Sequence, residues 1–188
     1  PNDFTSSGSS CVPATRWTQS TYRLGVDYDL DRDTMLYASY ATGFKSGGFN
    51  DGNTATAVNA NSIFYKPESL AAVEAGFKGR YLNRRLQVNG ALFSYNYSDL
   101  QVAATAPCIN AAGNCSVTQN AAKAKSYGFE LEGRYLATSA DRITFGLGYT
   151  NATYSSFVTT APTPADWSGK RLDKSPLLTL NLGYSHQC

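Results

Sequence analysis

The sequence predicts an all-β fold, in which antiparallel strands form a segment of a transmembrane β-barrel. Between Glu68 and Arg80 the residues alternate between polar and apolar with a period of two, and the same alternation recurs along the rest of the chain. The connections between these segments are alternately short and long. A strand with one apolar and one polar face is typical of a wall between lipid and a wet lumen.

The composition is compatible with this prediction. Of the 188 residues, 42% are hydrophobic and only 16% are charged, against about 25% charged in an average soluble protein. The net charge of +2 is too small to indicate a nucleic-acid partner. No run of about 18 apolar residues occurs, so neither a transmembrane helix nor a signal peptide is predicted. The chain begins with Pro1, and we therefore expect an upstream portion that has been removed or is missing.

Seven segments are predicted to be strands, at about 17–30, 33–43, 68–81, 86–103, 122–136, 141–155 and 175–185. In the first two, the apolar positions alternate with polar or small ones, at Tyr22, Leu24, Val26 and Tyr28, then at Leu36, Ala38 and Tyr40. In the third, the apolar face carries Ala71, Val73, Ala75 and Phe77.

The fourth segment begins with the same alternation, at Leu86, Val88 and Leu92. Further on, Phe93, Tyr95 and Tyr97 fall on the polar side, where they either line the wide end of a barrel or follow a β-bulge. The last three segments alternate clearly, with apolar positions at Tyr127, Phe129, Leu131, Tyr135, Ile143, Phe145, Leu147, Tyr149, Leu178, Leu180, Leu182 and Tyr184.

Register gives an independent check, because opposed residues of a hairpin must face the same side. Pairing Tyr81 with Leu86 sets Lys78 opposite Asn89 and Phe77 opposite Gly90. Two further pairs, Tyr28 with Leu36 and Tyr135 with Ile143, keep the apolar faces of the other two hairpins together.

The connections are sorted by length. Short turns are expected near 31–33, 82–85 and 138–140, and long connections at about 44–67, 104–121 and 157–174. Outer-membrane barrels have short periplasmic turns and long extracellular loops, so we expect the three long connections to be extracellular.

Cys108 and Cys115 flank a short polar loop and are expected to form a disulfide, which indicates an oxidising compartment. Zinc binding is the alternative, but neither a histidine nor a CxxC motif lies nearby. The pairing of Cys11 and Cys188 stays open, with partners that could lie outside this chain.

Three motifs resemble the TonB-dependent outer-membrane receptors. Tyr65, Pro67 and Glu68, followed by Glu74-Ala-Gly-Phe-Lys78, resemble the Y-x-P-E…E-x-G-x-K segment of that family. The stretches 36–50 and 126–132 resemble the neighbouring strands in the same order.

The resemblance implies an outer-membrane location and a barrel of about 22 strands, of which this chain would be a later part. It also implies active transport of a scarce nutrient, most often a ferric siderophore or other iron complex. Capture by extracellular loops would be followed by movement of a plug domain energised through TonB. The plug domain, the TonB-contacting box and the closing strand are absent from this sequence, so the partners would be membrane lipid, the ligand, and a plug and TonB outside the chain.

Two groups of residues are candidate sites. Phe44, Lys45, Phe49 and Asn50 would lie at the extracellular mouth and could contact an anionic, aromatic ligand, or the loop could simply be rich in turns. A row of charged residues is expected to face the lumen, either contacting a plug and substrate or forming structural ladders: Glu74, Lys78, Arg80, Glu130, Glu132 and Arg134.

No catalytic residue, cofactor or metal site is predicted. Glu130 and Glu132 are neighbours on one strand face with no cleft implied, which argues against a glycosidase. The acidic stretch 27–33 lacks the glycine and glutamate of a calcium loop. His186 is the only histidine, so no histidine-based triad can form. Two alternatives to active transport stay open, namely a passive outer-membrane pore and a secreted carbohydrate-binding β-sandwich.

Overall fold

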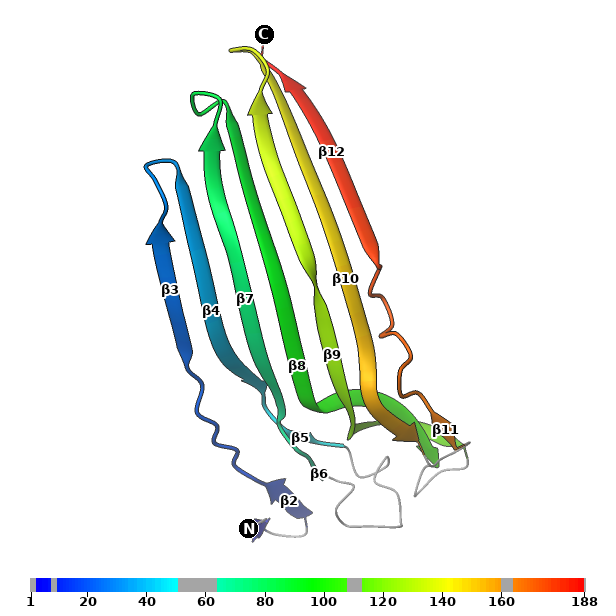
Figure 1. Cartoon of the computed structure of the whole chain (residues 1–188). Helices are drawn as coiled ribbons and strands as arrows, with labels where there is room; N and C mark the ends of the chain where they lie inside the picture. The colour runs from blue at the N-terminus through cyan, green and yellow to red at the C-terminus, as the bar shows by residue number, and fades with distance from the viewer. Residues whose placement is uncertain (1–2, 8–9, 51–63, 108–112, 160–163, 188) are drawn as a thin grey trace.

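A computed structural model of the chain describes residues 3–7, 10–50, 64–107, 113–159 and 164–187. Within these residues the protein is built from strands alone (Figure 1). Their bounds are β1 Asp3–Ser7, β2 Ser10–Ala14, β3 Arg23–Asp29, β4 Thr34–Lys45, β5 Gly48–Phe49, β6 Phe64–Tyr65, β7 Glu68–Tyr81, β8 Leu86–Pro107, β9 Asn114–Leu136, β10 Asp141–Thr159, β11 Ala165–Asp166 and β12 Leu178–His186.

The long strands form one antiparallel sheet in the order β3-β4-β7-β8-β9-β10, with β11 and β12 both paired to β10. Two small hairpins, β1–β2 and β5–β6, lie outside this sheet. Short turns join the strands at one end and the long connections gather at the other (Figure 1). No helix in the described part of the chain has the length and apolar character that a membrane crossing requires.

The three pairings predicted from register are confirmed. Tyr81 pairs with Leu86 and Lys78 with Asn89 in the β7–β8 hairpin. Tyr28 pairs with Leu36, and Tyr135 with Ile143. The alternation of side chains and the length of each turn therefore predict the same strand pairing, and the structure has that pairing.

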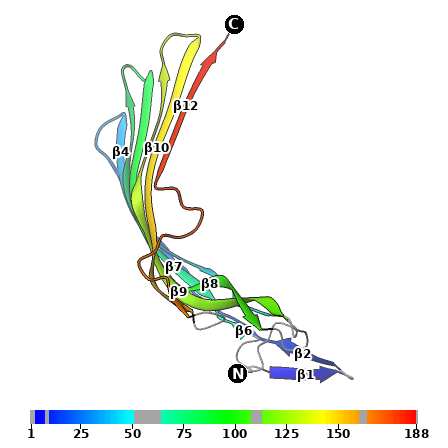
Figure 2. The same ribbon diagram turned by 90° about the vertical axis from the view of Figure 1, so that its right-hand side faces the viewer.

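The connection expected over 104–121 is much shorter in the structure, because β8 continues to Pro107 and β9 begins at Asn114. The two strands stay paired along this extension, from Gln101 opposite Asn120 to Pro107 opposite Asn114. The ladder shifts between Tyr97 and Gln101, around Asp99 with its positive φ of 54°. The sheet bends over its lower half (Figure 2), as a bulge allows.

Aromatic residues of β8 keep to the polar face without a bulge before them. The β7–β8 ladder is continuous to the pair Ser69 and Ser98, so the bulge alternative for Phe93, Tyr95 and Tyr97 is wrong. Phe93 stacks on Tyr95 with ring centroids 5.0 Å apart.

Other strand ends differ from the predicted bounds by a few residues. The first long strand begins at Arg23. The last hydrogen bond beyond this end of the ladder runs from the Thr42 N–H to the Tyr22 carbonyl. The last begins at Leu178, after Pro176, which has no N–H to donate. β10 extends to Thr159 past a register shift at Ser155.

The sheet is a single curved layer, seen edge-on in Figure 2. Its apolar face is uncovered, and Leu24, Leu180 and Leu182 are 68%, 76% and 78% exposed. The buried apolar residues of the described chain are few and mostly small, namely Ala122, Ala124, Ala152 and Phe157. A sandwich needs a second sheet packed on the first, so the β-sandwich alternative is wrong for the described residues.

Candidate functional site

The six charged residues predicted to share a face do so, on the side of the sheet opposite the apolar face. Lys78 and Glu132 stand in one cross-strand row, joined through Asn89, and Arg80 and Arg134 stand in the next, joined through Gln87. None of the six forms an ion pair with another within 4 Å. Five of them instead contact a neutral polar or aromatic side chain, or Asp33 at the strand end.

Glu74 and Lys78 meet at an aromatic residue. The Tyr37 hydroxyl donates a 2.8 Å hydrogen bond to Glu74, and the Lys78 ammonium lies 5.6 Å from the centroid of the same ring. The ring thus interacts with a cation through its face and with a carboxylate through its hydroxyl. Glu130 lies on the same polar face one row away and has no ion-pair partner among the described residues.

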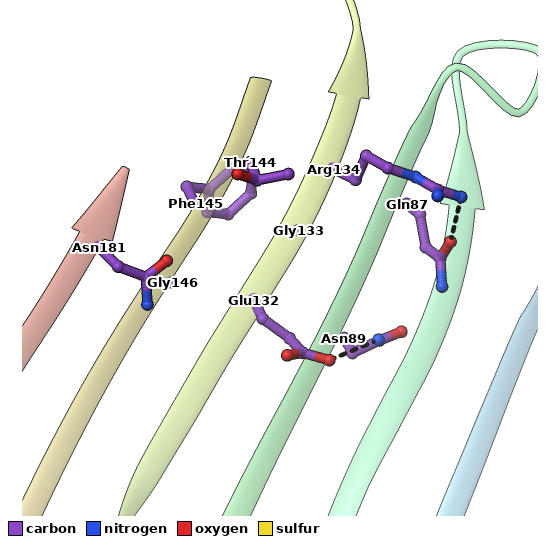
Figure 3. Close-up of a pocket in the computed structure, with 9 residues that line it drawn as sticks. All are labelled: Gln87, Asn89, Glu132, Gly133, Arg134, Thr144, Phe145, Gly146 and Asn181. Atoms are coloured by element: carbon purple, nitrogen blue, oxygen red, sulfur yellow. Dashed lines mark hydrogen bonds between the residues drawn. The ribbon is translucent and has the colours of Figure 1, made fainter. Parts of the chain in front are cut away.

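Further toward the short turns the polar face is hollowed (Figure 3). The hollow has a volume of about 350 Å³. Asn89 donates to Glu132 at 3.0 Å and Arg134 donates to Gln87 at 3.2 Å across its rim. The Asn89 side-chain oxygen is buried and has no hydrogen-bond partner. A buried amide oxygen usually has a donor, so this oxygen is an exception among the buried side chains of the described residues.

Arg80 belongs to the short-turn end. Its guanidinium lies 3.5 Å from the Asp33 carboxylate, and Arg84 approaches the same carboxylate at 3.0 Å. These pairs are half exposed, so they contribute little to stability. They tie the β3–β4 turn to the β7–β8 turn.

Two carboxylates outside the strand interiors have lowered pKa values. Asp141, the first residue of β10, accepts hydrogen bonds from Thr138, Tyr184 and His186, which lower its pKa to about 2. Asp166, the last residue of β11, has its pKa lowered by hydrogen bonds from the side chain and backbone of Ser168. Both carboxylates cap turns, and neither lies in a hollow with a second carboxylate, so they suggest no acid–base chemistry.

The four predicted mouth residues lie at the end with the long connections, in two groups. Phe44 and Lys45 end β4 and pair with Ser69 and Glu68; together they line a hollow of about 270 Å³. Phe49 and Asn50 follow the pair Gly47-Gly48, of which Gly48 begins β5.

Phe49 belongs to a small aromatic cluster. In the β5–β6 hairpin it pairs with Phe64, and the two rings meet edge to face at 5.7 Å. The ring centroids of Trp17 and Phe49 lie 6.3 Å apart. A Cβ added at Gly47 would lie 2.3 Å from the Tyr65 carbonyl oxygen and 2.6 Å from the Trp17 ring, so only glycine permits this packing. Phe49 is 47% exposed and presents an aromatic surface to a ligand.

Asn50 makes a contact that the sequence did not predict, and its contact with a ligand stays a prediction. Its side-chain amide donates to the Thr118 carbonyl at 2.9 Å and accepts from the Thr118 N–H at 2.8 Å. The amide therefore pairs with β9 as the backbone of a neighbouring strand would. It fastens the outgoing end of the 46–66 connection to the β8–β9 hairpin.

The returning end of this connection is held by two further amides. Asn120 donates to the Lys66 carbonyl at 2.8 Å and accepts from the Lys66 N–H. Gln101 donates to the carbonyls of Ser46 and Lys66 at 2.9 and 3.1 Å. We call Asn50, Gln101 and Asn120 the amide clasp. Sequence reasoning missed Gln101 and Asn120 because the loop expected over 104–121 hid the strand on which Asn120 stands.

The described residues contain no group of three or more His, Cys, Asp or Glu side chains that could hold a metal ion. Cys115 lies near the start of β9, and Cys108 falls outside the described residues. The Cys108–Cys115 disulfide therefore stays a prediction, and the pairing of Cys11 and Cys188 stays open.

Comparison with known protein families assigns this chain to a family. The family described as TonB dependent receptor-like, beta-barrel matches residues 2–187. The chain belongs to the TonB-dependent receptors. Receptors of this family are β-barrels of the bacterial outer membrane and act as transporters, not enzymes.

Relatives and solved structures agree with this assignment. The chain is 39% identical over 72 residues to the probable TonB-dependent receptor BfrD of Bordetella pertussis, which is 38% of this chain and 10% of the relative. It is 31% identical over 75 residues to the probable TonB-dependent siderophore receptor PiuA of Acinetobacter baumannii, which is 39% of this chain and 10% of the relative. The alignments span about a tenth of the length of these curated relatives.

Two siderophore-receptor structures share the fold. The siderophore receptor PiuA from Acinetobacter baumannii superposes on 97% of this chain and 26% of its own, with a TM-score of 0.69 and 20% identity. The ferric yersiniabactin uptake receptor FyuA from Yersinia pestis covers 87% of this chain and 22% of its own, with a TM-score of 0.64 and 17% identity. The sheet is therefore a part of such a barrel wall, open within the described residues.

Proposed function

We propose that this chain forms part of the barrel wall and of the extracellular mouth of a receptor. The receptor would import a ferric siderophore or a similar iron complex, and the import would be energised through TonB. The family match over residues 2–187 carries the proposal. The relative PiuA, named as a siderophore receptor, supports the class of ligand.

The long-connection end offers suitable chemistry for such a ligand. Ferric siderophores are compact and often anionic, and many carry aromatic rings. Phe44 and Phe49 are 44% and 47% exposed, and Lys45 supplies a positive charge at the same end. Asn50 contributes by holding Phe49 in place through the clasp. Phe44, Lys45 and Phe49 are the residues we expect to contact the ligand.

The polar face would then be the lumenal wall. Glu130, which has no ion-pair partner among the described residues, and the hollow of Figure 3 would face polar groups of a plug domain outside this chain. The apolar face would contact membrane lipid, since no other part of the described chain covers it.

Binding of radiolabelled ferric catecholate and ferric hydroxamate to cells that carry the intact receptor would test the proposal. Phe49→Ala should weaken binding of the preferred siderophore by about tenfold, because a lost aromatic contact costs about 1–1.5 kcal/mol. Tyr28→Leu, an exposed aromatic on the apolar face, is the matched control and should leave affinity unchanged. Equal affinities in the wild type and Phe49→Ala would contradict the mouth assignment.

Energy dependence separates this proposal from a passive pore. An uncoupler should stop uptake of the bound siderophore while leaving surface binding intact, because TonB depends on the inner-membrane gradient. Uptake that continues at the same rate with the uncoupler would instead establish the pore.

A further inference from the structure

A cluster of basic residues stands on the outer, apolar side of the sheet near its long-connection end. Lys123 and Lys125 alternate on β9 with the buried Ala122 and Ala124, and both lysines are exposed. Lys125 pairs across the sheet with Thr153 of β10. Thr153 in turn bridges to Arg171. Paired residues face the same side of a sheet, so the three cations share the apolar face.

These cations are not neutralised by the chain itself. No carboxylate lies within 4 Å of Lys123, Lys125 or Arg171 in the part of the chain that the structure describes. The Arg171 guanidinium donates to the Ser175 carbonyl, which leaves its other donors available. Ser156, opposite Lys123, adds an exposed hydroxyl to the patch.

The position of the cluster relative to the apolar band is informative. On β9 the band runs from Tyr135 to Tyr127, which is 50% exposed. Eight residues at ~3.4 Å, tilted by ~40°, span ~21 Å along the membrane normal. Lys125 then lies ~26 Å from Tyr135 on the same estimate. Since the lipid-facing band of such barrels is ~25 Å tall and ends in aromatic girdles, the lysines begin at headgroup level.

We infer that Lys123, Lys125 and Arg171 form a docking surface for the phosphate groups of an outer-leaflet glycolipid. The outer leaflet of this membrane consists of phosphorylated glycolipid, which offers clustered negative charge at that depth. Three cations beside an apolar band match a molecule with acyl chains below and phosphates above. Arginine and lysine side chains near an anionic membrane surface each add a favourable electrostatic contribution to binding, so the three cations together strengthen binding of a phosphorylated lipid.

The surface does not depend on which nutrient the receptor imports. It rests on the outward direction of the apolar face, and its failure would leave the siderophore proposal untouched.

The test uses the intact receptor extracted in mild detergent, with phosphorylated lipid A as the probe and dephosphorylated lipid A as the comparison. Native mass spectrometry measures the glycolipid bound per receptor. The triple variant Lys123→Gln, Lys125→Gln, Arg171→Gln should bind phosphorylated lipid A at least about tenfold more weakly than the wild type. Wild-type binding of the dephosphorylated probe should be as weak.

Two control variants separate charge from fold. Arg32→Gln, Arg84→Gln, Arg142→Gln removes the same charge at the opposite end of the sheet and should bind like the wild type. Lys123→Arg, Lys125→Arg, Arg171→Lys keeps the charge and should also bind. Equal binding by the wild type and the triple glutamine variant, or equal wild-type binding of both probes, would overturn the inference.

A salt titration of the wild type keeps the inference testable if the glutamine variant fails to fold. Binding of phosphorylated lipid A should fall as sodium chloride rises from low to high concentration, because salt screens exposed charges. Binding that does not change with salt would mean that acyl chains alone hold the lipid, and the docking surface would be wrong.

Discussion

Single side chains join distant segments at the long-connection end of the sheet. Asn50 is 68 residues from Thr118 in sequence, yet its amide takes the place of a backbone neighbour on β9. Asn120 repeats the arrangement from the opposite side by pairing with the backbone of Lys66. Because both ends of the 46–66 connection are fastened to β9 two residues apart, the aromatic cluster around Phe49 is held to the β8–β9 hairpin.

At the residue scale, Asn50→Ala should expose the Thr118 N–H. A lost hydrogen bond of about 1 kcal/mol corresponds to amide exchange at Thr118 that is faster by about five- to tenfold. Asn50→Asp is the matched control, because its carboxylate can still accept from the Thr118 N–H. Hydrogen exchange read by mass spectrometry on the intact receptor measures both. If alanine and aspartate gave the same rate as asparagine, the clasp would not hold this strand.

Among the strands, the glycines on the ladder show where the register is tight. A Cβ at Gly128 of β9 would come within 1.9 Å of the Tyr149 carbonyl oxygen on β10, which is backbone and cannot rotate away. At Gly43 of β4 an added Cβ meets nothing within 4 Å. Two glycines in the same kind of strand therefore have different reasons to be glycine.

At the element scale, Gly128→Ala should destabilise the receptor by about 1–3 kcal/mol, the usual range for overpacking. Gly43→Ala should be neutral or slightly stabilising, since glycine weakens a strand interior. The midpoint of urea unfolding, followed by the gel mobility of the folded barrel, compares the two. A Gly128→Ala receptor as stable as Gly43→Ala would contradict the close approach of β9 and β10.

The whole sheet is open within the described residues. β3 pairs with β4 only, and β12 pairs with β10 only. Unpaired backbone groups are very costly in a bilayer, so each of these edges needs a neighbour. The siderophore receptors that share the fold are about four times as long, since the chain covers 26% and 22% of two of them. We propose that further strands of the same receptor pair with both edges.

At the scale of the molecule, every backbone amide of β3 should therefore be protected in the intact receptor. An antiparallel edge strand otherwise leaves alternate N–H groups without a partner. Hydrogen exchange over Arg23–Asp29 is the measurement, with β8 as the internal standard because it is paired on both sides. Rapid exchange at alternate amides of β3, with β8 protected, would mean that no strand lies beside it.

The sequence by itself determined the strand type, the two faces and the register of three hairpins. Period-two alternation is a local property, and short turns transmit it to the next strand without error. This is why the sequence alone places Lys78 opposite Asn89, and Tyr135 opposite Ile143.

Only the tertiary structure decided the extent of β8 and β9 and the role of Asn50. The residues over 101–120 have weak alternation, and they pair as strands because each supplies the other with backbone partners. The amide clasp and the Lys123, Lys125 and Arg171 surface join residues far apart in sequence. Such contacts depend on which strands become neighbours and on how the sheet bends. The periodicity of the sequence predicts neither of these.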